Sequence, residues 1–117
     1  MAFVPTTDAG RARPFYEKTL GLKVSGEDEY GVMFDANGVR LRMSVVGGEF
    51  KPAPFTILSW VVSDIGPMVQ ALGSVGVIFE RYGFLEQDEL GVWASPDGAK
   101  VAWFRDTDGN VLSVAEL

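Results

Sequence analysis

The side chains that most often carry out catalysis are missing from this sequence. Its 117 residues include no histidine and no cysteine. Without cysteine there is no disulfide, thiolate nucleophile or zinc–thiolate site, and without histidine the usual general base and the commonest metal ligand are absent. Carboxylates gather at Glu86, Asp88 and Glu89, where acid–base or cation chemistry is conceivable, but such a run is more typical of a solvated surface.

Several other side chains are of types suited to binding. Trp93, Trp103 and Phe3 could stack on a flat ligand, while Arg42 could grip a carboxylate or phosphate through two parallel hydrogen bonds. Each has a structural alternative. A tryptophan in a strand commonly packs in the core, Phe3 would belong to the floor of a barrel, and Arg42 would lie on the solvated face of a hairpin. We predict ligand contact for these residues, with the alternatives left open.

Composition narrows the class of protein. A chain of 117 residues, 47% of them hydrophobic, is long enough for one domain with a real core. The net charge of −6, with no basic cluster, argues against a nucleic-acid partner. The sequence has no apolar run near the ~20 residues of a membrane helix and no signal peptide, so we expect a cytoplasmic protein without a membrane partner.

The elements that must position these residues occur twice in the chain. Asp8 and Asp64 each follow a strand-like segment and precede apolar residues at helical spacing. We therefore predict that both carboxylates accept hydrogen bonds from the first turn of a helix. Pro14 interrupts the first of these helices, and we predict either a kink there or a regular helix that starts near Ala12.

Two similar turns lie 71 residues apart, at Asn37-Gly38 and Asp108-Gly109. Strand-like patterns flank both of them. The strands predicted after the two helices are 22–25, 30–35 and 39–46 in the first half, and 76–81, 91–95, 100–105 and 110–115 in the second. Residues 81–93 have no counterpart in the first half. Their aromatic and apolar content predicts that they pack on something, such as a pocket or a partner subunit.

Two motifs resemble the vicinal oxygen chelate superfamily, which includes glyoxalase I, extradiol dioxygenases and bleomycin-binding proteins. Asp8, followed by Phe15-Tyr16 and Leu20-Gly21-Leu22, is similar to its D…FY…LGL opening. Residues 104–110 are similar to its F-x-D-P-D-G-N ending. The resemblance implies an α+β fold in a single domain, residues 1–117, with two βαβββ modules that form a curved mixed sheet around a cavity. The modules would span about 1–47 and about 55–117, with a linker at 48–54, and the resemblance also implies a homodimer.

The resemblance further indicates where metal-using relatives hold their ion, on the strand before each helix and on the last strand of each module. In this sequence those positions hold Met1, Ile57, Arg42 and Ser113. None of them supplies the imidazole nitrogen or carboxylate oxygen that a divalent ion prefers. We therefore predict no metal, no other cofactor and no catalytic residue. Ile57 and Ser113 become candidate ligand contacts, although a small residue that only makes room on the sheet is an equal alternative for Ser113.

Two functions follow as hypotheses. The first is a protein that binds a small hydrophobic or aromatic molecule in the cavity, as bleomycin resistance proteins do. Its predicted ligand-binding residues are Trp93, Arg42, Ser113, Trp103, Phe3 and Ile57. The alternative is a metal-dependent glyoxalase-like lyase, isomerase or dioxygenase, which would need a divalent ion to polarise substrate oxygens. A structural or regulatory role with a partner protein remains as a further hypothesis.

Overall fold

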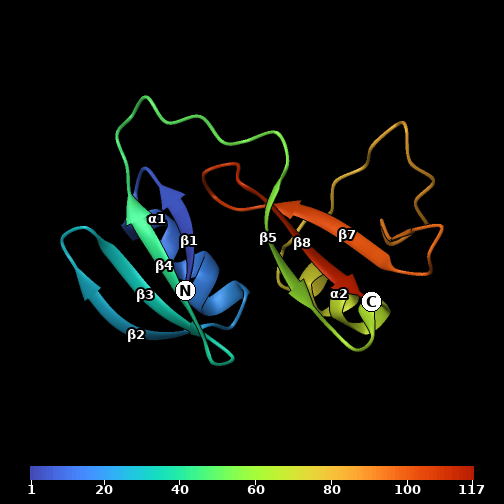
Figure 1. Cartoon of the computed structure of the whole chain (residues 1–117), viewed down its shortest axis with the longest axis horizontal. Helices are drawn as coiled ribbons and strands as arrows, with labels where there is room; N and C mark the ends of the chain where they lie inside the picture. The colour runs from blue at the N-terminus through green and yellow to red at the C-terminus, as the bar shows by residue number, and fades with distance from the viewer. The chain divides into compact units, whose positions relative to one another are not determined.

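Each half of the chain folds into a βαβββ module, as the computed structural model, which describes residues 1–117, shows (Figure 1). The chain divides into two compact units, Met1–Pro52 (the first unit) and Ala53–Leu117 (the second unit). The elements of the first unit are β1 (Ala2–Thr6), α1 (Ala9–Pro14), η1 (Phe15–Thr19), β2 (Lys23–Asp28), β3 (Gly31–Ala36) and β4 (Val39–Val45). Those of the second unit are β5 (Thr56–Val61), α2 (Ile65–Ser74), β6 (Trp93–Ala94), β7 (Lys100–Arg105) and β8 (Val111–Glu116).

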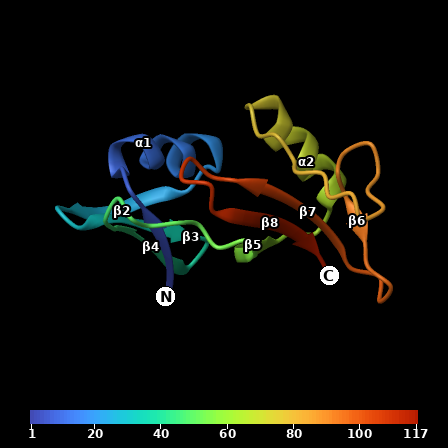
Figure 2. The same cartoon turned by 90° about the horizontal axis from the view of Figure 1, so that it is seen from above.

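The two sheets have the same topology. Their strand orders are β1-β4-β3-β2 and β5-β8-β7-β6, and in each sheet the first strand of the unit pairs in parallel with the last. The other pairs are antiparallel. Within each unit the helix covers one face of its own sheet, α1 against β3 and β4, and α2 against β7 and β8 (Figure 2). The predicted α+β architecture of two βαβββ modules is therefore confirmed.

The first helix begins after its predicted cap and changes at Pro14, while the alternative prediction of a regular helix that starts near Ala12 is wrong, because α1 begins at Ala9. Asp8 is its N-cap, and one carboxylate oxygen accepts a hydrogen bond from the Arg11 backbone N–H at 3.2 Å. The α-helical geometry ends at Pro14 and continues as the π-helical segment η1. Proline has no N–H to donate to the carbonyl four residues earlier, so the α-helical ladder is interrupted at this point. Ala12 and Tyr16 form the buried side of this helix.

The start of α2 corrects one prediction. Asp64 occupies the N-cap position with extended backbone dihedrals, but its side chain makes no capping hydrogen bond. The carboxylate of Glu116, at the end of β8, takes over this role and accepts from the Ile65 N–H at 3.0 Å. A carboxylate at a helix N-terminus is also favoured by the helix dipole. The cap thus comes from 51 residues further along the chain, where no local sequence pattern points to it.

The repeated turns adopt the conformations that their residues favour. Asn37 and Gly38 both have positive φ, 54° and 92°, as a two-residue hairpin turn of type I′ requires. In the second unit the corresponding turn is tied together by one buried side chain. Asp106 accepts hydrogen bonds from the backbone N–H groups of Asp108 and Asn110, both at 2.9 Å, and from the Asn110 side-chain amide at 2.9 Å.

One predicted strand is wrong. Residues 76–81 form no strand, and only an isolated bridge joins Phe79 to Phe104 on β7. The outer edge of β7 is shared between two partners, because β6 pairs with Lys100 and Val101 while the Phe79 segment takes the other end. Neither partner has room for a full ladder. The same competition shortens the strand predicted at 91–95 to β6, Trp93–Ala94.

Each unit has a buried core between its helix and its sheet. In the first unit Tyr16 packs against Phe34 with ring centroids 5.7 Å apart, and both side chains are fully buried. In the second unit Phe104 is fully buried and meets Phe79 edge to face at 5.6 Å. None of the helices is long and apolar enough to cross a membrane.

Candidate functional site

On the sheet face away from the helix, each unit presents a row of three side chains in register. In the first unit the row is Met33, Arg42 and Phe3, across β3, β4 and β1. In the second unit the row is Trp103, Ser113 and Ser59, across β7, β8 and β5. Neighbours in register on adjacent strands point to the same face. The structure therefore brings together Arg42 with Phe3, and Ser113 with Trp103, as parts of two equivalent rows.

The second row contains a residue that the sequence count missed. The Ser113 hydroxyl donates to the Ser59 hydroxyl at 2.7 Å, and Ser113 is buried. In both units the residue in register lies five positions before the cap: Phe3 lies opposite Arg42, and Ser59 lies opposite Ser113, past a bulge between Thr56 and Leu58. Ile57 is half-buried beside this bulge. The predicted positions seven residues before the caps, Met1 and Ile57, therefore lie outside the two rows.

These rows do not offer a divalent ion its ligands. They contain hydroxyls, a thioether, aromatic rings and a guanidinium, but no carboxylate and no imidazole. No group of three or more carboxylates elsewhere in the chain comes together in an arrangement that could hold a metal. A guanidinium repels a cation, and serine hydroxyls alone are weak ligands for one. The donor set therefore does not fit the metal of metal-using relatives.

Arg42 already has an anionic partner. Its guanidinium donates to the Asp28 carboxylate at 2.8 Å. This hydrogen bond, followed by that from the Tyr30 N–H, lowers the pKa of Asp28 below its ordinary value. The pair lies in a hollow of about 620 Å³ on β2, β3 and β4, lined by Ser25, Gly26, Glu27, Asp28, Met33, Asp35, Gly38, Arg40 and Arg42. An anionic ligand would have to displace Asp28, which weakens the case for Arg42 as an anchor.

The second unit has a hollow of different character, here called the aromatic pocket. Its volume is about 410 Å³. Its lining consists of Pro54, Phe55, Thr56, Tyr82, Phe84, Leu85, Trp93, Trp103 and Val111. This set contains no charged residue, and five of its nine members are aromatic. A mainly apolar lining and this volume are typical of sites for small organic molecules.

The rings of the aromatic pocket form one connected set. Trp103 lies 6.0 Å from Trp93 and 5.5 Å from Tyr82, which it meets edge to face. Tyr82 in turn lies 5.7 Å from Phe84. The indole N–H of Trp103 donates to the Thr56 hydroxyl at 3.0 Å. This bond fixes the central ring and satisfies its polar atom.

Two rings of the pocket are unusually exposed. Phe84 is 83% exposed and Phe55 is 65% exposed. Tyr82 is more protected, and burial, followed by the nearby Glu80 carboxylate, raises its pKa, which keeps the phenol neutral. Exposed aromatic surface around a hollow is the feature expected of a binding site rather than of a core.

The loop that carries Tyr82 and Phe84, between α2 and β6 (yellow to orange in Figures 1 and 2), is held by two polar side chains. Gln87 accepts from the Tyr82 N–H at 2.8 Å and donates to the carbonyls of Glu80 and Gly91 at 2.9 and 2.8 Å. Arg81 donates to two further loop carbonyls, those of Asp88 and Glu89, at 2.6 and 2.7 Å. The loop therefore forms a wall of the pocket, and hydrogen bonds within the loop fix its conformation.

Replacing Gln87 with alanine should loosen this wall. The variant loses three hydrogen bonds, each worth about 1 kcal/mol net, so amide exchange across residues 80–91 should accelerate at least about tenfold. Hydrogen exchange read by mass spectrometry or NMR measures the change. Glu89→Ala, which removes only a side chain and keeps the carbonyl that Arg81 contacts, is the control and should leave exchange unaltered. Equal exchange in wild type and Gln87→Ala would contradict this role.

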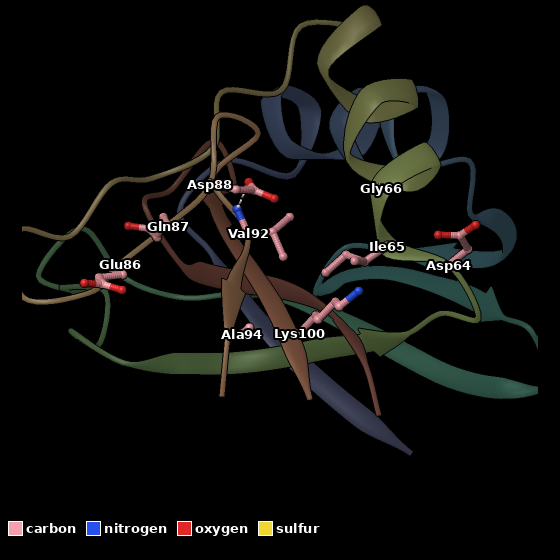
Figure 3. A pocket seen from close by; sticks show the side chains of 9 residues that line it. All are labelled: Asp64, Ile65, Gly66, Glu86, Gln87, Asp88, Val92, Ala94 and Lys100. Atoms are coloured by element: carbon pink, nitrogen blue, oxygen red, sulfur yellow. Dashed lines mark hydrogen bonds between the residues drawn. The ribbon is translucent and has the colours of Figure 1, made fainter. Parts of the chain in front are cut away.

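A third hollow lies on the helix side of the second sheet and involves the predicted carboxylate run (Figure 3). Its volume is about 480 Å³, and its lining is Asp64, Ile65, Gly66, Glu86, Gln87, Asp88, Val92, Ala94 and Lys100. One Asp88 oxygen accepts from the N–H groups of Leu90 and Val92, both at 2.9 Å, as the dashed line in Figure 3 shows for Val92. Asp88 thus shapes its own loop, and the α2 N-terminus is already capped by Glu116.

The predicted site residues therefore fall into two groups. Phe3 and Arg42 lie together in the first unit, where Phe3 is 61% exposed. Trp93, Trp103 and Ser113 lie together in the second, with Ile57 on the neighbouring strand. Sequence analysis missed Phe55, Thr56, Tyr82, Phe84 and Ser59 as lining or row residues. The aromatic content of residues 81–93 was the available signal for Tyr82 and Phe84.

Comparison with known proteins supports the fold. The sequence matches no family model and no curated protein. Its structure, however, is similar to that of an integron cassette protein from the mobile metagenome of the Halifax Harbour sewage outfall, with a TM-score of 0.76, 20% identity, and coverage of 99% of this chain and 95% of that one. It is also similar to lactoylglutathione lyase from Agrobacterium tumefaciens (TM-score 0.75, 16% identity, coverage 98% and 90%).

A third similar structure names the superfamily. It is a member of the glyoxalase/bleomycin resistance protein/dioxygenase superfamily from Sphaerobacter thermophilus, with a TM-score of 0.74, 21% identity, and coverage of 99% of this chain and 94% of that one. At identities this low the similarity concerns the fold and carries no function with it. The chain therefore has the vicinal oxygen chelate fold that its opening and closing motifs predict.

Proposed function

We propose that this protein binds a small hydrophobic or aromatic molecule in the aromatic pocket of the second unit, without a metal ion. The observation that carries the proposal is the set of four connected rings, Tyr82, Phe84, Trp93 and Trp103, around a hollow of about 410 Å³ without a charged lining residue. A flat ligand that covers such rings gains from the apolar area removed from water and from offset stacking.

The exposure of the rings supports binding over packing. A phenylalanine that is 83% exposed, as Phe84 is, forgoes most of the stabilisation, about 1.5–3 kcal/mol, that full burial of such a side chain provides. A bound ligand would recover part of it. The hydrogen bonds of Gln87 and Arg81 hold the loop in place without a ligand, so less ordering entropy is lost on binding.

Fluorescence of the protein offers a direct test. All three tryptophans, Trp60, Trp93 and Trp103, belong to the second unit. N-phenyl-1-naphthylamine, a neutral aromatic probe, should quench tryptophan emission with saturable binding. Trp103→Leu should weaken the affinity at least about tenfold, because the central ring contacts two others in the pocket.

The matched control is Trp60→Leu. Trp60 follows Ser59 on β5, so it points to the opposite face of the same sheet, and the affinity of this variant should stay within about twofold of wild type. Equal loss in both variants, or no saturable quenching in wild type, would refute the proposal.

The competing enzyme hypothesis predicts a metal. Elemental analysis of the purified protein should find no stoichiometric divalent ion if the donor set is as poor as the two rows indicate. Zinc, nickel, manganese or iron at one equivalent would instead favour the metal-dependent lyase, isomerase or dioxygenase. The cytoplasmic location and the homodimer stay predictions from the sequence, and sedimentation equilibrium measures the latter.

A further inference from the structure

The net negative charge of this protein comes from one unit. The second unit contains nine Asp and Glu residues and three Lys and Arg residues, which gives it a net charge of −6. The first unit has seven of each and is neutral. The whole excess of negative charge thus belongs to the unit that also holds the aromatic pocket. A potential of this sign raises the local concentration of cations and lowers that of anions.

The three cationic side chains of the second unit lie elsewhere, away from the aromatic pocket. Arg105 pairs with Glu80 at 2.5 Å and donates to the Gly109 carbonyl at 3.0 Å. Arg81 holds loop carbonyls, and Lys100 lines the hollow on the helix side. None of the three lines the aromatic pocket. A positively charged ligand in that pocket would therefore meet aromatic rings in a negative field, with no cation among the lining residues to repel it.

We infer that the aromatic pocket selects small organic cations, in particular quaternary or tertiary ammonium groups carried on an apolar or aromatic body. Four rings that surround one hollow can direct their electron-rich faces to a single positive centre, and tryptophan has the strongest such interaction. A quaternary ammonium has no N–H to satisfy, so a pocket whose polar side-chain groups are the hydroxyls of Thr56 and Tyr82 and the indole N–H groups of its two tryptophans suits it. This inference rests on the proposed function, because it specifies the ligand of the same pocket.

Three ligands that share a phenyl ring but differ in charge separate the possibilities. They are benzyltrimethylammonium, its neutral carbon isostere neopentylbenzene, and the anion benzenesulfonate. Tryptophan quenching at low salt should give the cation an affinity about tenfold above that of the neutral isostere, equivalent to about 1.4 kcal/mol, with no measurable binding of the anion. Raising the salt concentration from about 20 mM to about 500 mM should weaken the binding of the cation severalfold and leave the affinity for the isostere unchanged.

Substitutions assign the preference to the rings. Trp103→Leu should reduce the cation's advantage over its isostere to less than about threefold, whereas Trp60→Leu should leave that advantage intact. Phe84→Leu, at an exposed ring that the fold does not need, should reduce the advantage in part and provides a variant with unimpaired folding.

Each outcome decides one of the two proposals. Equal binding of cation and isostere, or tighter binding of the anion, would overturn the cation inference and leave the binding function standing. A cation preference that persists unchanged in both Trp103→Leu and Phe84→Leu would also overturn it, because the charge would then be recognised elsewhere. Absence of binding for all three ligands and for N-phenyl-1-naphthylamine would remove the binding function itself.

Discussion

Replacing Phe104 with alanine is expected to destabilise the second unit by about 3–5 kcal/mol, the usual cost of removing a buried aromatic ring. Phe104 is fully buried on β7 and meets Phe79 edge to face. Its loss leaves a cavity between the sheet and α2 that the surrounding elements cannot fill. Total stability of a small domain is of order 5–15 kcal/mol, so the variant should unfold at markedly lower denaturant concentration or be unfolded at the outset.

Urea unfolding followed by tryptophan fluorescence measures this effect where it occurs, because every tryptophan belongs to the second unit. Phe84→Ala is the matched control: the same residue type in the same unit, but 83% exposed. Its free energy of unfolding should stay within about 0.5 kcal/mol of the wild-type value, while its affinity for the aromatic probe falls. If Phe84→Ala unfolded as readily as Phe104→Ala, Phe84 would be a core residue and not a wall of the pocket.

The second large effect is expected at Asp106. Its carboxylate is buried and accepts hydrogen bonds from two backbone N–H groups and from the Asn110 amide. Alanine at this position leaves those donors buried without a partner, at about 1–3 kcal/mol for each group that water cannot reach. We expect Asp106→Ala to cost about 2–4 kcal/mol, measured by urea unfolding.

The internal repeat provides the control. Asp35 precedes the turn glycine Gly38 by three residues, as Asp106 precedes Gly109, but it is exposed and accepts one hydrogen bond there, from Gly38 at 2.8 Å. Asp35→Ala should cost less than about 1 kcal/mol, followed by far-UV circular dichroism because the first unit has no tryptophan. A larger decrease in the free energy of unfolding for Asp35→Ala than for Asp106→Ala would show that burial of the aspartate does not determine how much it stabilises the turn.

The two units have diverged in chemistry while they kept one topology. At equivalent places in the two rows, Arg42 of the first unit corresponds to Ser113 of the second, and Met33 corresponds to Trp103. The first row holds a guanidinium neutralised by Asp28, and the second holds a pair of hydroxyls beside a connected set of rings. The proposed binding activity therefore belongs to one unit, and duplication of the fold did not duplicate the site.

Local patterns were enough to predict most of the elements. The cap at Asp8, the interruption at Pro14 and the hairpin at Asn37-Gly38 depend on residues within one turn of the backbone, and the structure confirms each. The strand predicted at 76–81 was wrong for a non-local reason. Its residues suit a strand, but β6 already occupies part of the edge of β7 that it would need. Propensity does not record such competition.

The candidate site shows the same division. Trp93 and Trp103 were predicted individually, and residues 81–93 were expected to pack on something, but their meeting required the loop to fold back onto β7. Ser59 escaped prediction because the row residue lies five positions before the cap in both units, as Phe3 does before Asp8, and not the predicted seven. The ion pair between Arg42 and Asp28 could not be predicted either, because it depends on how β2 lies beside β3 and β4.

The sequence by itself determined the repeated order of strand, helix and strands, the turns, and a donor set without histidine or cysteine, because these depend on residue type and short-range spacing. Only the tertiary structure decided that Tyr82 and Phe84 join Trp93 and Trp103 around one hollow, and that Glu116 and not Asp64 caps α2. Contacts between residues distant in sequence depend on sheet register and loop path, which a single bulge or a shared strand edge can alter.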